Sequence, residues 1–264
     1  MGYRDRADLP RAIQFLEAAL KLQQAMGDVR GEASQLTNLG VAYRDLGESR
    51  RALDFFSAAS EKFRELGNPQ GKASVLSNMA IIYHAFGEFE RALALHQQAF
   101  DIERKIGYRL GEASDHGNLA LVYWDLELWE RVQEHLQAAL VIHQQIDDLR
   151  SVANDLSHLG LLARRQARLD EAIRFLEEAR ILHQQLGFRQ GEAGDWGNLG
   201  LVYRDRGDWE RAMQANEHAL QIDHEIGYKQ GEASELNRIA NLLVDHGEFT
   251  RAISLHTDAL SIAE

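Results

Sequence analysis

Apolar and small residues recur along the chain at a long, constant period. The segment WGNLGLVYRDRGDWERA, which begins at Trp196, has a counterpart in each successive window of the sequence. A catalytic motif would be expected once, whereas a motif in every window indicates a repeat architecture. The counterparts begin at Leu36, Leu76, His116, Leu156 and Leu236, so the period is 40 residues, the difference between Leu36 and Leu76, with no insertion or deletion.

Each window predicts a first helix, here called helix A, over residues 31–46 and the equivalent positions. Its recurring positions are spaced by three and four, which places them on one face of a helix. A small residue beside a large one lets a neighbouring helix approach closely, and a tyrosine fills the remaining gap. The alanine column is Ala33, Ala73, Ala113, Ala153, Ala193 and Ala233, the small column is Gly40, Ala80, Ala120, Gly160, Gly200 and Ala240, and the tyrosine column is Tyr43, Tyr83, Tyr123, Ala163, Tyr203 and Leu243.

A second helix, here called helix B, is predicted over residues 48–66 and the equivalent positions. A glycine separates the two helices in most windows, and glycine suits the left-handed position that ends a helix. A helix pair without strands cannot bury its apolar stripe alone and must stack on its neighbours. The separating residues are Gly47, Gly87, Gly207 and Gly247, with Glu127 and Ala167 as exceptions.

We therefore predict an all-α fold, a single α-solenoid of about 13 helices over residues 1–264. Residues 3–20 align with 203–220, so the chain is expected to open at the end of a helix A and to supply one unpaired helix B. Neither end carries a polar capping helix, which suggests a piece of a longer array or ends that pair with something. The predicted units are a half repeat over 1–27 and full repeats over 31–67, 71–107, 111–147, 151–187, 191–227 and 231–264.

The composition narrows the class of protein. The chain has 264 residues, of which 45% are hydrophobic and 27% charged, and this is a globular composition. Because the net charge is −12, general nucleic-acid binding is not expected. No cysteine is present, which excludes disulfides, and no apolar run is long enough to insert into a membrane. We expect a soluble, cytoplasmic protein.

The order Trp196-x-x-Leu199-Gly200-x-x-Tyr203, followed by Ala212, resembles the signature of the tetratricopeptide repeat (TPR). The longer period and the junction between repeats are similar to those of kinesin light chains and of Pins/LGN-like adaptors. The resemblance covers essentially the whole chain and implies a right-handed superhelix whose concave face is lined by helix A. Departures are the missing proline at the end of each repeat and a poorly matching repeat over 151–187.

The resemblance implies that helix-A positions not used in packing bind a peptide. The most distinctive column is Asn38, Asn78, Asn118 and Asn198, interrupted by His158 and Arg238. A carboxamide offers both a donor and an acceptor, so it can hold a peptide backbone without reading its sequence. The alternative is that the asparagines brace a neighbouring helix or loop.

Two further columns lie beside the asparagines. An apolar ridge would take aliphatic side chains of the ligand unless it is used in packing between helices. Its members are Val41, Ile81, Leu121, Leu161 and Leu201, followed by Asn241. The other column can select acidic peptides, because arginine binds carboxylates bidentately. The alternative is that these side chains pair with neighbouring aspartates, which would cancel their positive electrostatic field. Its members are Arg44, His84, Trp124, Arg164 and Arg204, and the neighbouring aspartates are Asp45, Asp125 and Asp205.

No cofactor or metal site is expected. His143 and His183 share a column, but one repeat separates them, which is too far for a single ion. No nucleophile, base and acid stand outside the repeat columns, so we do not expect an enzyme. The predicted function is a scaffold that binds an extended, acidic segment of a protein partner. The alternatives are a unit that self-associates head-to-tail through uncapped ends, and a regulatory or sensor domain excised from a larger signalling protein.

Overall fold

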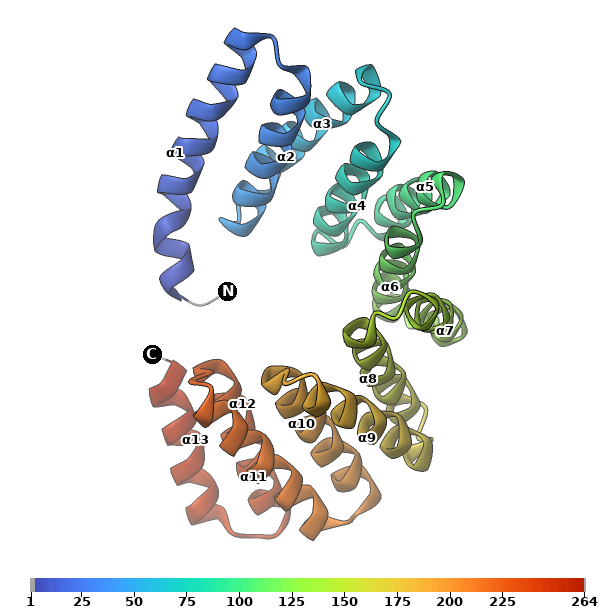
Figure 1. Cartoon of the computed structure of the whole chain (residues 1–264). Coiled ribbons are helices and arrows are strands. Elements are labelled where there is room, and N and C mark those ends of the chain that lie inside the picture. The colour runs from blue at the N-terminus through green and yellow to red at the C-terminus, as the bar shows by residue number, and fades with distance from the viewer. Residues whose placement is uncertain (1–2, 264) are drawn as a thin grey trace. The chain divides into compact units, whose positions relative to one another are not determined.

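The computed structural model describes residues 3–263, and this part of the chain is built of thirteen α-helices without a strand (Figure 1). The predicted all-α class and helix number are therefore confirmed. The helices are α1 (Tyr3–Met26), α2 (Val29–Asp45), α3 (Ser49–Glu65), α4 (Pro69–Ala85), α5 (Phe89–Ile106), α6 (Arg109–Asp125), α7 (Trp129–Gln145), α8 (Leu149–Arg165), α9 (Leu169–Gln185), α10 (Arg189–Arg206), α11 (Trp209–Glu225), α12 (Lys229–Asp245) and α13 (Phe249–Ala263).

The chain divides into two compact units, one ending at Ala139 and the other beginning at Leu140, so the boundary falls inside α7. In the first unit α2 packs on α3 and α4 on α5, and in the second α8 packs on α9, α10 on α11 and α12 on α13. Even-numbered helices from α2 onward are the predicted helices A. Consecutive helices A also approach one another, α2 to α4 to α6 in one unit and α8 to α10 in the other.

A small residue of helix A packs against a large residue of helix B in each unit. A Cβ atom added to Gly40 would lie 2.5 Å from the Phe56 ring, and one added to Gly160 would lie 2.6 Å from Leu176 Cγ. Both large side chains are fully buried, as is Leu39 next to Gly40. The small column therefore has the packing role that the sequence predicts.

The turns between helices share one backbone geometry. Gly47 and Gly207 have left-handed φ angles of 88° and 81°, and the amide of the following residue donates to a carbonyl five positions back, as from Asp208 to Tyr203 at 2.9 Å. This is the hydrogen-bond pattern that closes a helix on a left-handed residue. Where glycine is missing, Glu127 and Ala167 keep the same conformation, with φ of 56° and 58°. The fold therefore imposes the turn even where the side chain disfavours it.

One expectation about the N-terminal part is wrong. The alignment placed the end of a helix A before the first helix B, but α1 runs from Tyr3 to Met26 without a turn. Ala7 stands where the other windows mostly have glycine, and alanine continues a helix that glycine would end.

Replacing Ala167 by glycine is expected to stabilise the second unit. An L-residue in the left-handed region costs about 1–2 kcal/mol, and part of this gain is offset by the greater freedom of glycine in the unfolded chain. We expect the free energy of unfolding, measured by urea denaturation, to rise by up to about 1 kcal/mol. The matched change is Gly207→Ala, at a site with no heavy atom within 4 Å of an added Cβ, and it should destabilise. Equal stability of all three proteins would contradict this explanation of the turns.

Candidate functional site

Helices α4 and α6 line a polar cavity of about 350 Å³, here called the α4–α6 cavity. It brings together two asparagines of the predicted ligand column, Asn78 and Asn118, which lie one repeat apart. Ile81 of the apolar ridge lies on the same wall. Two acidic residues that the sequence analysis did not select, Glu103 of α5 and Asp115 of α6, line it as well.

The asparagine column is accessible but partly engaged. Asn38 is exposed, whereas Asn78, Asn118 and Asn198 are half-buried. The Asn78 side chain accepts a hydrogen bond from Arg44 Nη1 at 2.7 Å and donates to its own helix, to the carbonyl oxygen of Ser74, at 2.8 Å. Asn78 therefore braces two neighbouring helices A in the structure, which is one of the two roles that the sequence left open.

Two other members of this column lie in the second unit. His158 is exposed on α8, and Arg238 is half-buried on α12. Arg238 Nη1 donates to Glu235 Oε1 of its own helix at 2.6 Å. Arg238 carries a positive charge, and His158 carries one only when protonated, whereas the other members of the column carry a neutral amide.

The arginine column pairs with aspartates of the next repeat. Arg164 Nε lies 2.6 Å from Asp205 Oδ2, and Arg204 Nε lies 2.7 Å from Asp245 Oδ2. This is the neighbouring pairing that the sequence left open as an alternative, and it removes much of the field that would attract an acidic ligand. Similar contacts join His84 to Asp125 at 2.8 Å and Arg44 to Asp45 at 3.0 Å. Trp124 packs edge-on against Trp129, with ring centroids 5.5 Å apart.

The apolar ridge remains open to solvent in the first unit. Ile81 is 39% exposed and Leu121 is 47% exposed, on α4 and α6 respectively. Val41, Leu161 and Leu201 are half-buried. Large aliphatic side chains that stay this accessible are available for contact with a ligand.

Sequence reasoning missed two buried histidine–aspartate pairs, each of which joins a helix B to the next helix A. His143 Nδ1 lies 2.6 Å from Asp155 Oδ2, and His183 Nδ1 lies 2.7 Å from Asp195 Oδ2. All four residues are buried. The sequence signal was present in two columns that lie twelve residues apart and have to be read together. The first column is Gln23, Phe63, Glu103, His143, His183 and Asp223, and the second is Gln35, Val75, Asp115, Asp155, Asp195 and Glu235.

At the α4–α6 cavity the same two positions hold two acids. The pKa of Glu103 is raised to about 8, mainly by burial and then by the nearby Asp115 carboxylate, which repels its charge and hydrogen bonds with it. A Cβ atom on Gly111 would collide with the Glu103 carboxyl group, so glycine at this position makes room for the acid. Glu103 therefore retains its proton at neutral pH, next to the side chain of Asp115.

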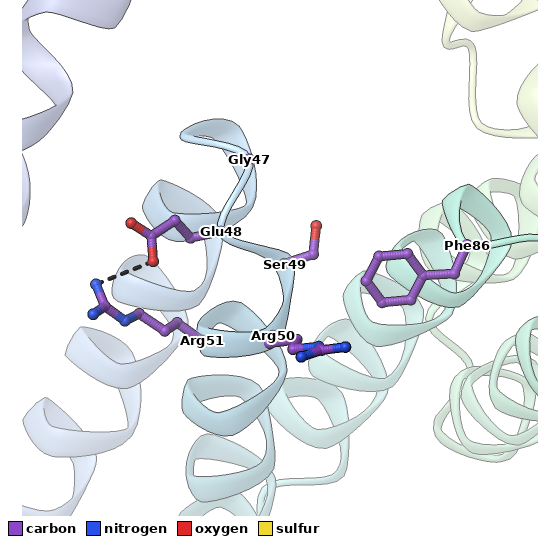
Figure 2. A pocket seen from close by; sticks show the side chains of 6 residues that line it. All are labelled: Gly47, Glu48, Ser49, Arg50, Arg51 and Phe86. Carbon is purple, nitrogen blue, oxygen red and sulfur yellow. Dashed lines mark ion pairs between the residues drawn. The ribbon is translucent and has the colours of Figure 1, made fainter.

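A second, more open cavity of about 300 Å³ lies at the turn between α2 and α3, and Figure 2 shows the residues that line it. Arg50 of α3 and Phe86, in the turn after α4, flank the opening, whereas Arg51 points away and pairs with Glu48 at 3.1 Å. None of its residues belongs to the predicted ligand columns. We therefore take the α4–α6 cavity as the candidate site.

Residues 3–263 contain no cluster of three or more histidine, cysteine, aspartate or glutamate side chains arranged to bind a metal ion. Within the same residues, none of the helices is both long enough and apolar enough to cross a membrane.

Comparison with known proteins identifies the repeat. A family model described as tetratricopeptide repeat matches residues 32–105, 111–184 and 195–264. No curated protein matches the chain. These matched segments cover most of the sequence.

Solved structures share the fold at low sequence identity. BtubC (BKLC) from P. vanneervenii has a TM-score of 0.74 at 23% identity, covering 83% of this chain and 92% of that one. The repeats of a putative kinesin light chain from Podospora anserina have a TM-score of 0.60 at 16% identity, covering 74% and 96%. A Rap protein complexed with competence and sporulation factor has a TM-score of 0.66 at 15% identity, covering 97% and 85%. Because these sequence identities are low, the structural similarity establishes a shared fold and nothing further.

The stability of the first unit is expected to depend on the ionisation of Glu103. Its folded pKa of about 8 lies above the ordinary value of 4.5, so the protonated form favours folding. Stability is therefore full below about pH 4.5 and is lost as the pH rises towards 8. In the wild type, we expect the free energy of unfolding, measured by urea denaturation, to fall by on the order of 2 kcal/mol between pH 5 and pH 8. In Glu103→Gln this decrease should be absent. Glu90→Gln, on the exposed side of α5, should keep the wild-type slope. A wild-type slope in Glu103→Gln would show that another group causes it.

Proposed function

The chain belongs to the tetratricopeptide repeat family, and from that premise we propose that it is a protein–protein interaction scaffold. It binds an extended segment of a partner protein along its helices A and carries out no chemistry of its own. The observation that carries the proposal is the α4–α6 cavity, where two asparagines one repeat apart face the same space beside an exposed apolar ridge. A solved protein of the same fold, the Rap protein, is complexed with a factor, which supports a binding role.

The chemistry of this wall suits a peptide backbone. Asn118 and Asn78 each present a carboxamide, which can donate to a carbonyl and accept from an amide of the same ligand. Each such hydrogen bond contributes on the order of 1 kcal/mol net. Ile81 and Leu121 stay accessible beside them and would bury aliphatic side chains of the ligand at about 25 cal/mol per Å².

Selection for acidic ligands is not part of the proposal. Arg164 and Arg204 already contact aspartates at 2.6 and 2.7 Å. A ligand carboxylate would have to replace these partners, and exchanging one half-exposed ion pair for another yields little net free energy. The apolar ridge and the amides are left as the main source of affinity.

The double substitution Asn78→Ala/Asn118→Ala tests the binding mode. We expect the wild-type protein to enrich extended peptides from a random library. The double variant should bind the same peptides about thirtyfold more weakly, because two backbone hydrogen bonds are lost. The measurement is peptide pull-down followed by fluorescence anisotropy on the enriched sequences.

The control for this experiment is Gln97→Ala/Gln137→Ala, which removes two carboxamides that are exposed on α5 and α7. It should bind like the wild type. If the asparagine variant stays helical and retains full affinity, the asparagines only brace the helices, as Asn78 does towards Arg44. If wild type enriches no peptide, the scaffold proposal itself fails.

A second candidate function, self-association, is favoured by apolar side chains on two helices. On α1, Phe15 is 76% exposed and Leu22 is 59% exposed. On α13, Phe249 is 60% exposed and Ile253 is 66% exposed. Exposed apolar clusters of this kind mark interaction surfaces, and contact between two different faces of identical chains produces head-to-tail assembly.

Light scattering tests this second candidate. If the chain self-associates, its mean mass should rise with protein concentration. Phe15→Glu/Leu22→Glu should return it to the monomer mass, because burying two carboxylates against an apolar face is unfavourable. A concentration-independent monomer mass of the wild type would eliminate this candidate and leave peptide binding untouched.

A further inference from the structure

We propose that the α4–α6 cavity is a subsite for one cationic side chain of the bound segment, a lysine or an arginine, held between Glu103 and Asp115. That this side chain belongs to a bound peptide rests on the proposed function. That the cavity binds an alkylammonium or guanidinium group does not. The proposal gives the scaffold a sequence preference opposite in charge to the one expected from the arginine column.

The two carboxyl groups are buried and incompletely satisfied. Glu103 is 5% exposed and Asp115 is 1% exposed, and both line the cavity. Asp115 Oδ1 accepts from Ser77 Oγ at 2.6 Å and faces His96 Nδ1 at 3.3 Å. Apart from the proton that Glu103 itself carries, no hydrogen-bond donor among the described residues reaches Glu103 Oε2 or Asp115 Oδ2. Buried oxygens without a donor are costly to the fold and are the atoms that a cationic ligand would satisfy.

The other repeats show what normally fills this place. In two of them the aspartate meets a histidine from the preceding helix B, His143 for Asp155 and His183 for Asp195. In the repeat with Asp223 and Glu235, which also pairs two acids, Arg238 donates to Glu235 at 2.6 Å. In each case the chain itself supplies a basic group, although Asp223 Oδ1 and Glu235 Oε2 also remain without a donor. At the α4–α6 cavity the equivalent of these histidines is Glu103, and both acids of the pair line the cavity.

The charges around the cavity favour a cation. Glu112 of α6 adds a negative charge that acts on Glu103, and it pairs with Arg109 at 2.5 Å. His96 and His116 are the histidines near Asp115, and His96 contacts only one of its oxygens. Burial lowers the pKa of His116, which reduces its charge at neutral pH. The Glu103–Asp115 pair is therefore short of neighbouring positive charge.

The rest of the cavity suits a long basic side chain. Ile81 and Leu110 line the cavity and offer apolar surface to a methylene stem. Because Gly111 has no side chain, the Glu103 carboxyl group fits against the first turn of α6. The volume of about 350 Å³ holds a lysine or arginine side chain.

Binding should release a proton. In the unliganded protein Glu103 holds a proton at neutral pH, since burial and Asp115 raise its pKa to about 8. A bound cation takes the place of this proton, which passes to the buffer. Affinity should therefore rise with pH up to about 8 and become constant above it.

The direct test uses n-butylammonium and methylguanidinium, which reproduce the ends of lysine and arginine. Each is titrated into the wild type and followed by NMR through the amide signals of Gly111 and Asp115. We expect saturable binding that strengthens from pH 6 to pH 8. Glu103→His recreates the histidine–aspartate pair of the other repeats, so it should fold and lose at least about tenfold in affinity. Glu103→Gln should lose the pH dependence, and Glu90→Gln should behave as wild type. Lack of saturation in wild type, or equal binding by Glu103→His, would overturn the proposal.

A peptide experiment separates this inference from the scaffold proposal. Acetylated, amidated peptide pools carry lysine, arginine or norleucine at one position, which removes the terminal amine as a source of cation. Preference for lysine or arginine in wild type, lost in Glu103→His, supports the subsite. Peptide binding without such a preference would overturn the subsite and leave the scaffold standing. If no peptide binds but the small cations do, the subsite stands and the scaffold proposal fails.

Discussion

Each repeat depends on one close approach, in which a small residue of helix A lies directly against a large side chain of helix B. Gly40 against Phe56 and Gly160 against Leu176 leave no room even for a Cβ atom. This contact sets the spacing of the helix pair, and the left-handed turn sets its direction. Once both are fixed, every helix A presents equivalent positions to its neighbour, and the ligand columns follow from that register. Asn216 occupies the place of Phe56 beside Gly200, so the contact requires a fitting shape more than an apolar side chain.

Most of the fold could be predicted because repetition averages out local ambiguity. A single glycine such as Gly87 is weak evidence for a turn, but glycine at the same place in most windows is strong evidence. The prediction failed in α1, where one window was aligned to the others without its glycine. Ala7 continues the helix. The other windows could not reveal this, because the alignment assumes that equivalent positions adopt the same structure.

The site was only partly predictable. The asparagine column and the apolar ridge are visible in sequence because each is a single column, and the α4–α6 cavity brings Asn78, Asn118 and Ile81 together. The acid pair is harder to find, because its members vary in type from repeat to repeat and lie on different helices. The arginine column was visible, but sequence alone could not decide whether Arg164 faces a ligand or Asp205. That choice depends on a distance between repeats, 2.6 Å in the structure.

The pair of positions that holds Glu103 and Asp115 shows which chemistry the fold requires and which it merely permits. In the preceding repeat the same positions are Phe63 and Val75, both buried and apolar. The repeat therefore folds without polar groups there, and replacing a buried charged pair by apolar residues is often neutral or stabilising. Two acids at this place carry a desolvation cost that the architecture does not need, and they carry it beside an open cavity. In the following repeats a histidine reduces that cost from within the chain. At the α4–α6 cavity His96 faces only one oxygen of Asp115. Further compensation has to come from a proton or from a ligand, which is why this pair is the strongest indication of specificity in the molecule.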